Sequence, residues 1–438
     1  MKVLKFGGTS VGSPERMKNV ANIICDGNRK IVVLSAVSGT TNKLVEISNL
    51  AEKKQKNDAF REIENLEKRY TVFLDELYKI SEYKKQANDI LITIFDTLKS
   101  LVDSPFTVRT EKRILAQGEI ISTNLFYLHL IENKVNAVLV SALNFMRIGK
   151  DDEPDYFYIK ENLKREIKAF PEAEIIVTQG FITKNVYGEI DNLQRGGSDY
   201  SASLIGAAIK ADEIQIWTDI DGFHNNDPRY VKNTSAIREL SFDEAAELAY
   251  FGAKILHPAS VLPAKLQDIP VLLKNTLQPE ALGTLITRNE TGDGIKAVAA
   301  KDGITAIKIN SARMLLAHGF LRKVFETFEK YETSIDMITT SEISVSVTID
   351  NIKNLQSIGN ELEKYSNITV EHDQTIICVV GNFIAEKTGV ALKVFEALGN
   401  IPLRMISYGG SKHNISLLIN TKDKQEALEL LSKHLFSE

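Results

Sequence analysis

The sequence is poor in the residues that mark several classes of protein. It has only two cysteines in 438 residues, Cys25 and Cys378, and their separation gives neither a metal-ligand spacing nor a disulfide framework. We expect both to be reduced thiols of a cytoplasmic protein. No apolar run is long enough to span a membrane, and the few residues before Lys5 are too short for a secretory signal.

Neither sign of charge dominates the chain. Its 53 Lys and Arg residues face 58 Asp and Glu residues, and the net charge of -5 argues against nucleic acid as the main partner. The composition, 43% hydrophobic and 25% charged, is typical of soluble globular proteins. A chain of 438 residues is too long for one ordinary core, so we expect two or three domains.

Short apolar, β-branched segments alternate with helical patterns through the first 290 residues. This alternation predicts an α/β fold with a mostly parallel sheet that is covered by helices on both faces. Residues 50–105, rich in Lys and Glu with apolar residues at helical spacing, interrupt the alternation and predict inserted amphipathic helices. The predicted strands are residues 3–6, 31–35, 137–141, 174–178, 213–217 and 270–274.

An internal repeat follows a glycine-rich polar linker at 286–303. Val324-Phe325-Glu326 recurs 70 residues later as Val394-Phe395-Glu396, and 344–350 aligns with 414–420 at the same offset. Each copy predicts the order strand, loop, helix, strand, turn, strand. A repeat of this length indicates a duplicated small α+β module.

The stretch KFGGTSVGSP, which begins at Lys5, combines a strand end, a glycine turn and a helix start. Gly7 and Gly8 can adopt backbone conformations closed to other residues and permit close approach of a ligand. Ser13 is a candidate N-cap and Pro14 suits the first helical position. Such a turn is an anion site, to which Lys5 adds a positive charge. Taken alone, an ordinary glycine turn is the better interpretation.

Two further polar clusters have the same ambiguity. RGGSDY, from Arg195, is a second glycine turn before an Ala-rich helix; Arg195 could hold a carboxylate, whereas Asp199 alone would only offset the helix dipole. Thr218 and Asp219 follow the predicted strand at 213–217. Ligands bind at the carboxyl ends of such strands, which favours a binding role for both residues. A loop with acidic turn residues and no such role is an equally good interpretation.

Five motifs in this order resemble the aspartate kinases of the amino-acid kinase superfamily. They are KFGGTSV from Lys5, QGFI from Gln179, RGGSDYSA from Arg195, WTDIDGF…DPR from Trp217, and FGAKILHP from Phe251. The terminal repeat resembles the tandem ACT domains of these enzymes, one inserted in the other. SIDMITTSE, from Ser334, is most similar to the lysine-inhibited class.

The resemblance implies an amino-acid kinase fold over residues 1–290, with the helical insert at about 50–105. It implies a regulatory region of two ferredoxin-like ACT modules over 300–438. The first module is expected at about 312–370, and the second at 371–438 together with the strand near 303–310. Pairing through the ACT modules implies a homodimer or homotetramer.

The implied reaction transfers the γ-phosphoryl group of ATP to the side-chain carboxylate of L-aspartate, giving 4-phospho-L-aspartate. This is the first step of lysine, threonine and methionine biosynthesis. The nucleophile has a reference pKa of about 3.9 and needs no general base, so catalysis reduces to positioning and relief of charge repulsion. The resemblance implies Mg²⁺ held mainly by ATP phosphates, with no direct protein ligand.

Residue by residue, the resemblance makes Lys5 the main transition-state cation and Asp199 the organiser of the site. Glu119 would pair with the substrate ammonium, although taken alone it fits a helix-surface acid. His224 stands where the family usually has tyrosine. The implied ATP-binding residues are Lys5, Gly7, Gly8, Thr218, Asp219, His224, Arg229 and Lys254; the substrate-binding residues are Thr41, Glu119, Arg195 and Ser198.

The resemblance also implies inhibition by L-lysine. Asp336 and Glu342 would meet its ammonium groups, and Ala317, in place of a common serine, removes one hydrogen bond. The implied effector residues are Met314, Gly319, Leu321, Ser334, Asp336, Ser341 and Glu342. Two alternatives stay open: another amino-acid kinase, and a catalytically inactive ACT-type amino-acid sensor.

Overall fold

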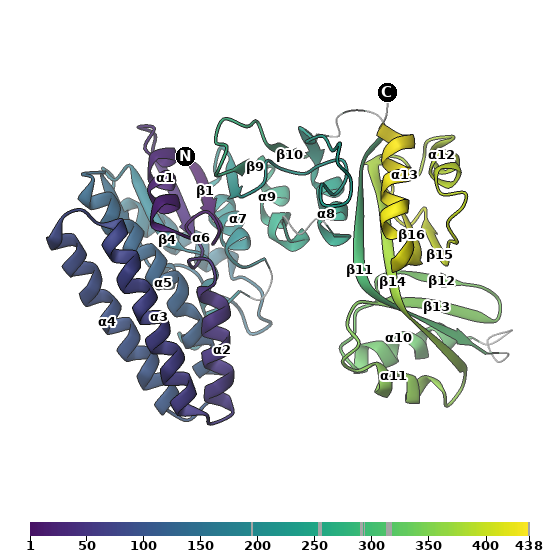
Figure 1. Ribbon diagram of the computed structural model, residues 1–438, viewed down its shortest axis with the longest axis horizontal. Coiled ribbons are helices and arrows are strands. Elements are labelled where there is room, and N and C mark those ends of the chain that lie inside the picture. The colour runs from purple at the N-terminus through teal and green to yellow at the C-terminus, as the bar shows by residue number, and fades with distance from the viewer. Residues whose placement is uncertain (194–195, 253–255, 290–291, 293, 312–317, 437–438) are drawn as a thin grey trace. The chain divides into compact units, whose positions relative to one another are not determined.

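The computed structural model describes residues 1–193, 196–252, 256–289, 292, 294–311 and 318–436 (Figure 1). The chain forms two compact units. The first comprises Met1–Phe223, Arg238–Phe242 and Ile255–Asn289, and the second His224–Ile237, Asp243–Lys254 and Glu290–Glu438. Two segments that precede residue 290 therefore fold with the C-terminal half.

An eight-stranded sheet, in the order β3-β4-β2-β1-β7-β9-β10-β8, forms the centre of the first unit. Its strands pair in parallel except for β10, which is antiparallel to β9. All six predicted strands are present. The strands are β1 (Lys2–Phe6), β2 (Lys30–Leu34), β3 (Ala137–Leu139), β4 (Ile175–Gln179), β7 (Ile214–Thr218), β8 (Glu239–Ser241), β9 (Val271–Asn275) and β10 (Thr284–Thr287), with a separate hairpin of β5 (Ile182–Lys184) and β6 (Ile190–Asn192).

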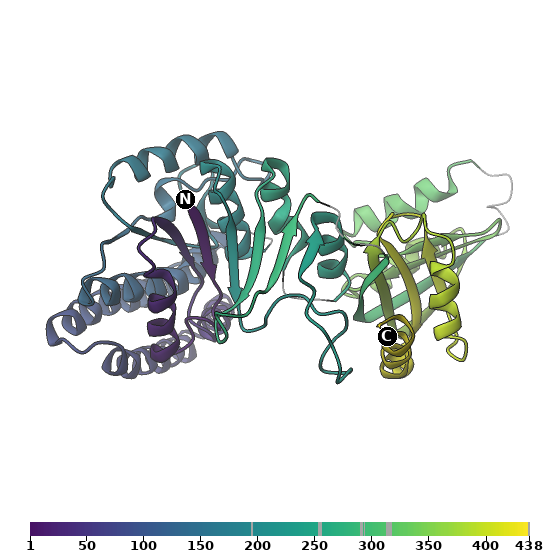
Figure 2. The ribbon, with the colours of Figure 1, turned by 90° about the horizontal axis from the view of Figure 1, so that it is seen from above.

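Helices cover both faces of this sheet, as predicted (Figure 2). Leu4 and Phe6 of β1 join one large apolar core with α1–α5, whereas the alternate residue Val3 points to the opposite face. The insert at 50–105 forms two long helices, α3 and α4. The helices are α1 (Pro14–Ile24), α2 (Thr40–Glu52), α3 (Lys56–Leu77), α4 (Ser81–Asp103), α5 (Val108–Glu132), α6 (Tyr156–Lys168), α7 (Gly197–Ile209) and α9 (Leu262–Gln267).

The second unit is built on a six-stranded antiparallel sheet, in the order β12-β13-β11-β14-β16-β15. The long strands β11 and β14 pair at its centre. The elements are β11 (Gly294–Asn310), α10 (Phe320–Lys330), β12 (Ile338–Thr340), β13 (Ser344–Ile349), α11 (Leu355–Leu362), β14 (Asn367–Asn382), α12 (Val390–Ala397), β15 (Met405–Tyr408), β16 (Asn414–Asn420), α13 (Lys424–Phe436), and α8 (Phe242–Tyr250), which belongs here from Asp243 onward.

The predicted repeat is visible as two equivalent halves, β11-α10-β12-β13 and β14-α12-β15-β16. Val324 and Val394, the matched residues, are both fully buried in their helices. Each half has its own core. The strand near 303–310 was grouped with the second module, but here Ile307 and Ile309 pack in the core of α10 and α11, and this part of β11 pairs with β13.

Candidate functional site

The carboxyl end of β1 lies between two parallel neighbours, with Lys5 beside Val33 of β2 and Ile216 of β7. The chain leaves β1 through α1 towards β2, whereas β7 lies on the other side and its later neighbours β9 and β10 continue outward. In open α/β sheets, ligands bind at the carboxyl ends of the strands at such a point. The predicted phosphate turn follows β1 and Thr218 ends β7, so both lie there.

The glycine turn after β1 is held by its neighbours' backbones. The Gly7 N–H donates to the Trp217 carbonyl at 3.1 Å, and the Ser38 N–H donates to the Gly8 carbonyl at 3.1 Å. Neither glycine has a positive φ, so the prediction of an unusual backbone conformation was wrong. Close approach is the actual reason for glycine, because a Cβ on Gly8 would lie 2.8 Å from the Ala36 carbonyl oxygen.

The helix start that follows is capped as the sequence predicted. The Ser13 hydroxyl accepts from the Arg16 N–H at 3.2 Å, and Pro14 occupies the first position of α1. The sequence did not identify Ser10 and Thr276, whose hydroxyl oxygens are 2.7 Å apart. Their contact ties the glycine turn to the end of β9, which no local pattern could indicate.

Lys5 and Asp199 form an ion pair at this sheet edge, with 2.6 Å between Lys5 Nζ and Asp199 Oδ1. Their side chains are only 11% and 16% exposed. Asp199 is in the first turn of α7, which begins at Gly197 after the N-cap Gly196; these two glycines have φ of 45° and 63°. The predicted second glycine turn is therefore confirmed, and it also places Ser198 in a buried position beside Lys5's partner.

Glu119, on α5, is buried, so its reading as a helix-surface acid was wrong. Its Oε1 accepts from the Ala36 N–H at 3.1 Å, while Oε2 has no hydrogen-bond partner among the described residues. Burial raises the pKa of Glu119 to about 7, against the opposing effects of the Ala36 N–H and the Lys5 charge. A buried acceptor without a partner is costly and suits a bound cation.

The loop between β2 and α2 is fixed by the inserted helix α3. The hydroxyls of Thr40 and Tyr70 lie 2.8 Å apart, both buried, and Arg69 Nη2 donates to the Ser38 carbonyl at 2.7 Å. Thr41 is exposed in the first turn of α2. The insert therefore positions the start of α2, which carries a predicted substrate residue, and the amphipathic pattern of α3 gave no sign of this role.

Thr218 ends β7, and its hydroxyl donates to Asp219 Oδ1 at 3.2 Å. Asp219 is exposed. Trp217 is buried and stacks on Phe6 with ring centroids 5.6 Å apart, so it belongs to the core, as predicted. The polar pair thus lies at the end of β7, directly after a residue of the apolar core.

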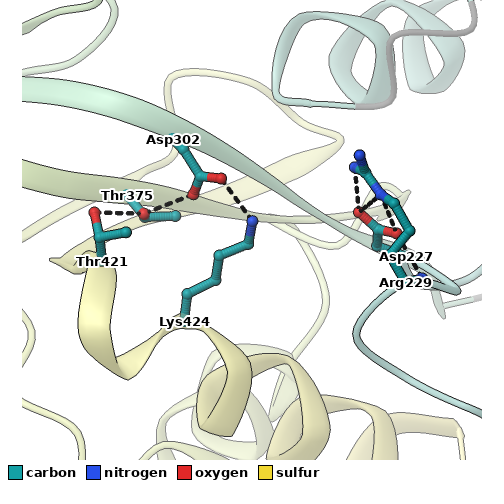
Figure 3. Close-up of polar contacts among 6 residues, drawn as sticks. All are labelled: Asp227, Arg229, Asp302, Thr375, Thr421 and Lys424. Atoms are coloured by element: carbon teal, nitrogen blue, oxygen red, sulfur yellow. Dashed lines mark hydrogen bonds and ion pairs between the residues drawn. The ribbon is translucent and has the colours of Figure 1, made fainter.

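His224 and Arg229 belong to the second unit. The His224 ring Nδ1 is 2.9 Å from the Thr234 hydroxyl. Arg229 clamps Asp227 through Nε at 3.0 Å and Nη2 at 2.6 Å (Figure 3). Burial opposes ionisation of Asp227, but the Arg229 hydrogen bonds outweigh it and lower its pKa.

Polar contacts fasten this loop to the C-terminal half of the unit. Lys424 Nζ lies 2.7 Å from Asp302 Oδ2 and 3.9 Å from the centroid of the Tyr230 ring. Asp302 also accepts from Thr375, whose hydroxyl is 3.0 Å from that of Thr421 (Figure 3). A buried lysine thus links the loop to β11 and α13.

The side chains of the predicted effector residues differ in their exposure to solvent. Gly319 caps α10 with φ of 85°. The Asp336 side chain is only 1% exposed. The exposed members are Gly319, Leu321, Ser334, Ser341 and Glu342.

Four residues named from the sequence lie outside the described part of the chain: Arg195, Lys254, Met314 and Ala317. Within the described residues, no three His, Cys, Asp or Glu side chains are grouped to hold a metal ion. In that same part of the chain, no helix has the length and apolarity needed to cross a membrane.

Comparisons with known proteins agree with this geometry. The model of the amino acid kinase family matches residues 1–275, and that of an ACT domain matches 377–435. The "Lysine-sensitive aspartokinase 3" of Escherichia coli K12 is 34% identical, and the alignment covers 99% of each chain.

Two crystal structures of E. coli aspartokinase III cover all of this chain and are themselves fully covered. The complex with aspartate and ADP (R-state) has a TM-score of 0.86 at 33% identity. The complex with lysine and aspartate (T-state) has a TM-score of 0.82 at 32% identity. With a matching kinase fold, a matching repeat and full-length similarity, the chain belongs to the aspartokinases of the amino acid kinase family.

Proposed function

We propose that the protein transfers the γ-phosphoryl group of ATP to the side-chain carboxylate of L-aspartate. The observation that carries the proposal is the pairing of two opposite features at one sheet edge. Lys5 offers a cation beside a bare glycine turn, while Glu119 offers a buried carboxylate oxygen that has no partner among the described residues. A polyphosphate needs the first, and an amino-acid ammonium needs the second.

The chemistry follows from these charges. The aspartate carboxylate attacks the γ-phosphorus, the bond to the β,γ-bridging oxygen breaks, and ADP leaves. Lys5 Nζ lies where it can offset the charge on the phosphoryl oxygens, and Asp199 holds that ammonium in place. Mg²⁺ would be held mainly by the ATP phosphates and would neutralise part of their charge.

The remaining roles are proposals from the motifs. Glu119 and Arg195 take the substrate ammonium and α-carboxylate, so the two ends of aspartate fix its orientation. The backbone of Gly7 and Gly8 approaches the phosphates. The further contacts are those of Thr41 and Ser198 with aspartate, and of Thr218, Asp219, His224, Arg229 and Lys254 with the nucleotide.

We further propose inhibition by L-lysine at the ACT region. The relative named lysine-sensitive and the E. coli structure that contains lysine support this effector. The proposed division is catalytic for 1–290 and regulatory for 300–438, with a homodimer or homotetramer formed through the ACT modules. The proposed location is the cytoplasm, which suits two cysteines that are both free thiols.

Coupled ATP turnover with L-aspartate, with and without L-lysine, tests the proposal. We expect aspartate-dependent turnover that lysine suppresses. Lys5→Met should lower kcat by about 10²–10³-fold, because it removes a cation aimed at the developing charge. Lys2→Met, on the same strand but paired with Glu213 outside the site, is the matched control.

The outcomes separate the candidate functions. Turnover in the presence of lysine at the uninhibited rate would refute the effector but keep the kinase. Turnover with another amino acid instead of aspartate would favour a different amino-acid kinase. Lysine binding without any turnover would favour the inactive sensor.

A further inference from the structure

Four side chains of the second unit, among them the buried Asp336, form one cluster. Lys301 Nζ, from β11, lies 2.7 Å from Asp336 Oδ1 and 2.9 Å from Asp350 Oδ2. The Tyr250 hydroxyl, at the end of α8, donates to the same Asp336 oxygen at 2.6 Å. The Lys301 ammonium also lies 4.4 Å from the centroid of the Tyr250 ring. One ammonium is thus enclosed by two carboxylates and an aromatic ring.

This set of groups is chemically suited to a primary ammonium. Carboxylates accept its N–H bonds, and an aromatic face attracts its charge. Burial opposes the charge on Lys301, but hydrogen bonds to the two carboxylates outweigh it and raise the pKa of Lys301. The cluster therefore stabilises the ammonium ion of a partly buried lysine.

The site is not saturated by Lys301. The Asp336 side chain is only 1% exposed, and its Oδ2 has no hydrogen-bond partner among the described residues. Asp350 is 44% exposed and marks the outer edge of the cluster. Lys301 occupies Asp336 Oδ1, so an ammonium from solution would compete with it for this carboxylate.

The motifs already assign Asp336 to the ammonium of the effector. We propose that Lys301 is a tethered competitor for this ammonium position, and that Asp350 and the Tyr250 ring complete it. This inference rests on the proposed lysine regulation. Free L-lysine carries the same butylammonium side chain as Lys301, so the two compete for one set of partners. Lys301 thereby sets the lysine concentration at which the effector binds.

The test uses the full chain and measures L-lysine binding by calorimetry together with half-inhibition of ATP turnover. In Lys301→Met the side chain is neutral and roughly isosteric with lysine, so it no longer competes for the carboxylates. We expect the Kd for lysine to fall about tenfold, which is the size expected when one charge-assisted hydrogen bond becomes available to the ligand. Lys308→Met is the matched control: Lys308 lies on the same strand and pairs with Glu371 at 2.7 Å, away from the cluster. L-Norleucine, which lacks the side-chain ammonium of lysine, should gain no affinity in either variant.

A double variant guards against misfolding. Lys301→Met combined with Asp350→Asn should bind lysine more tightly than Asp350→Asn alone, because these two variants differ only at Lys301. Unchanged or weaker lysine binding on replacing Lys301 in both backgrounds would overturn the inference, as would an equal gain in Lys308→Met. Tighter lysine binding that appears only in variants with a neutral residue at position 301 supports the inference, even if the unaltered protein binds no measurable lysine.

ATP turnover tests the proposed kinase activity independently of lysine binding. Aspartate-dependent turnover with no lysine binding in any variant would leave the kinase intact and refute the tethered competitor. Tighter lysine binding in Lys301→Met without turnover would support the subsite and refute the kinase.

Discussion

Glu119→Gln should stabilise the protein at neutral and higher pH while weakening aspartate binding. In the folded chain the Glu119 pKa is raised from 4.5 to about 7 by burial. The folded state thus binds this proton more tightly than the unfolded state does. Protonated Glu119 therefore contributes to the free energy of unfolding. This contribution is fully present below pH 4.5 and is lost as the pH rises through about 7.

The magnitude follows from the size of the shift. A shift of about 2.5 pKa units, at about 1.36 kcal/mol per unit, gives a loss of ~3 kcal/mol well above pH 7. Glutamine carries no charge, and its side-chain carbonyl can still accept the Ala36 N–H. The free energy of unfolding of the variant should therefore exceed that of the unaltered protein by ~3 kcal/mol at pH 8. The two values should be equal near pH 4.5.

Urea unfolding at several pH values measures this difference without aspartate. Trp217 is the single tryptophan and is buried in the first unit, so its fluorescence reports the unit that contains Glu119. Glu46→Gln, at a half-exposed carboxylate on α2, is the control and should show no such trend. A stability difference that stays constant between pH 5 and 8 would refute the assigned burial cost.

Aspartate should reverse the effect, because its ammonium supplies the partner that Glu119 Oε2 lacks among the described residues. Binding should release a proton near pH 7, visible as a buffer-dependent heat in calorimetry. The glutamine variant should bind aspartate more weakly and release no such proton. Equal proton release from both proteins would assign the titration to another group.

Three further changes test other parts of the structure. Gly8→Ala places a methyl group 2.8 Å from a backbone carbonyl and should cost about 1–3 kcal/mol, measured as a lower urea midpoint; an unchanged midpoint would contradict the close packing. Tyr70→Phe leaves the buried Thr40 hydroxyl without this partner and should cost about 1 kcal/mol and raise KM for aspartate, whereas an unaltered KM would show that α3 does not position the loop. Lys296→Met leaves Glu244, which is fully buried, without its ion pair at 2.8 Å and should destabilise the second unit by about 3–5 kcal/mol in thermal unfolding; a loss below 1 kcal/mol would mean that other contacts hold the carboxylate.

The sequence was sufficient wherever the signal is local. Apolar runs gave the six predicted strands, and the Ser13 cap and Pro14 gave the start of α1, because these patterns arise within a few residues. The strands β5, β6, β8 and β10, of three or four residues each, were missed because so short a run carries too little periodicity. The family could be named, and candidate site residues proposed, from motifs that sit at strand ends.

The tertiary structure alone decided which charges are buried and with what they pair. Glu119 has the sequence context of a surface helix, yet the packing of the β2 loop over α5 buries it and raises its pKa. Lys301 and Asp336 are separated by a helix and a loop in the chain but meet in one cluster. Burial and long-range pairing depend on how elements stack, and the free energy of a charge depends on that environment rather than on its neighbours in sequence.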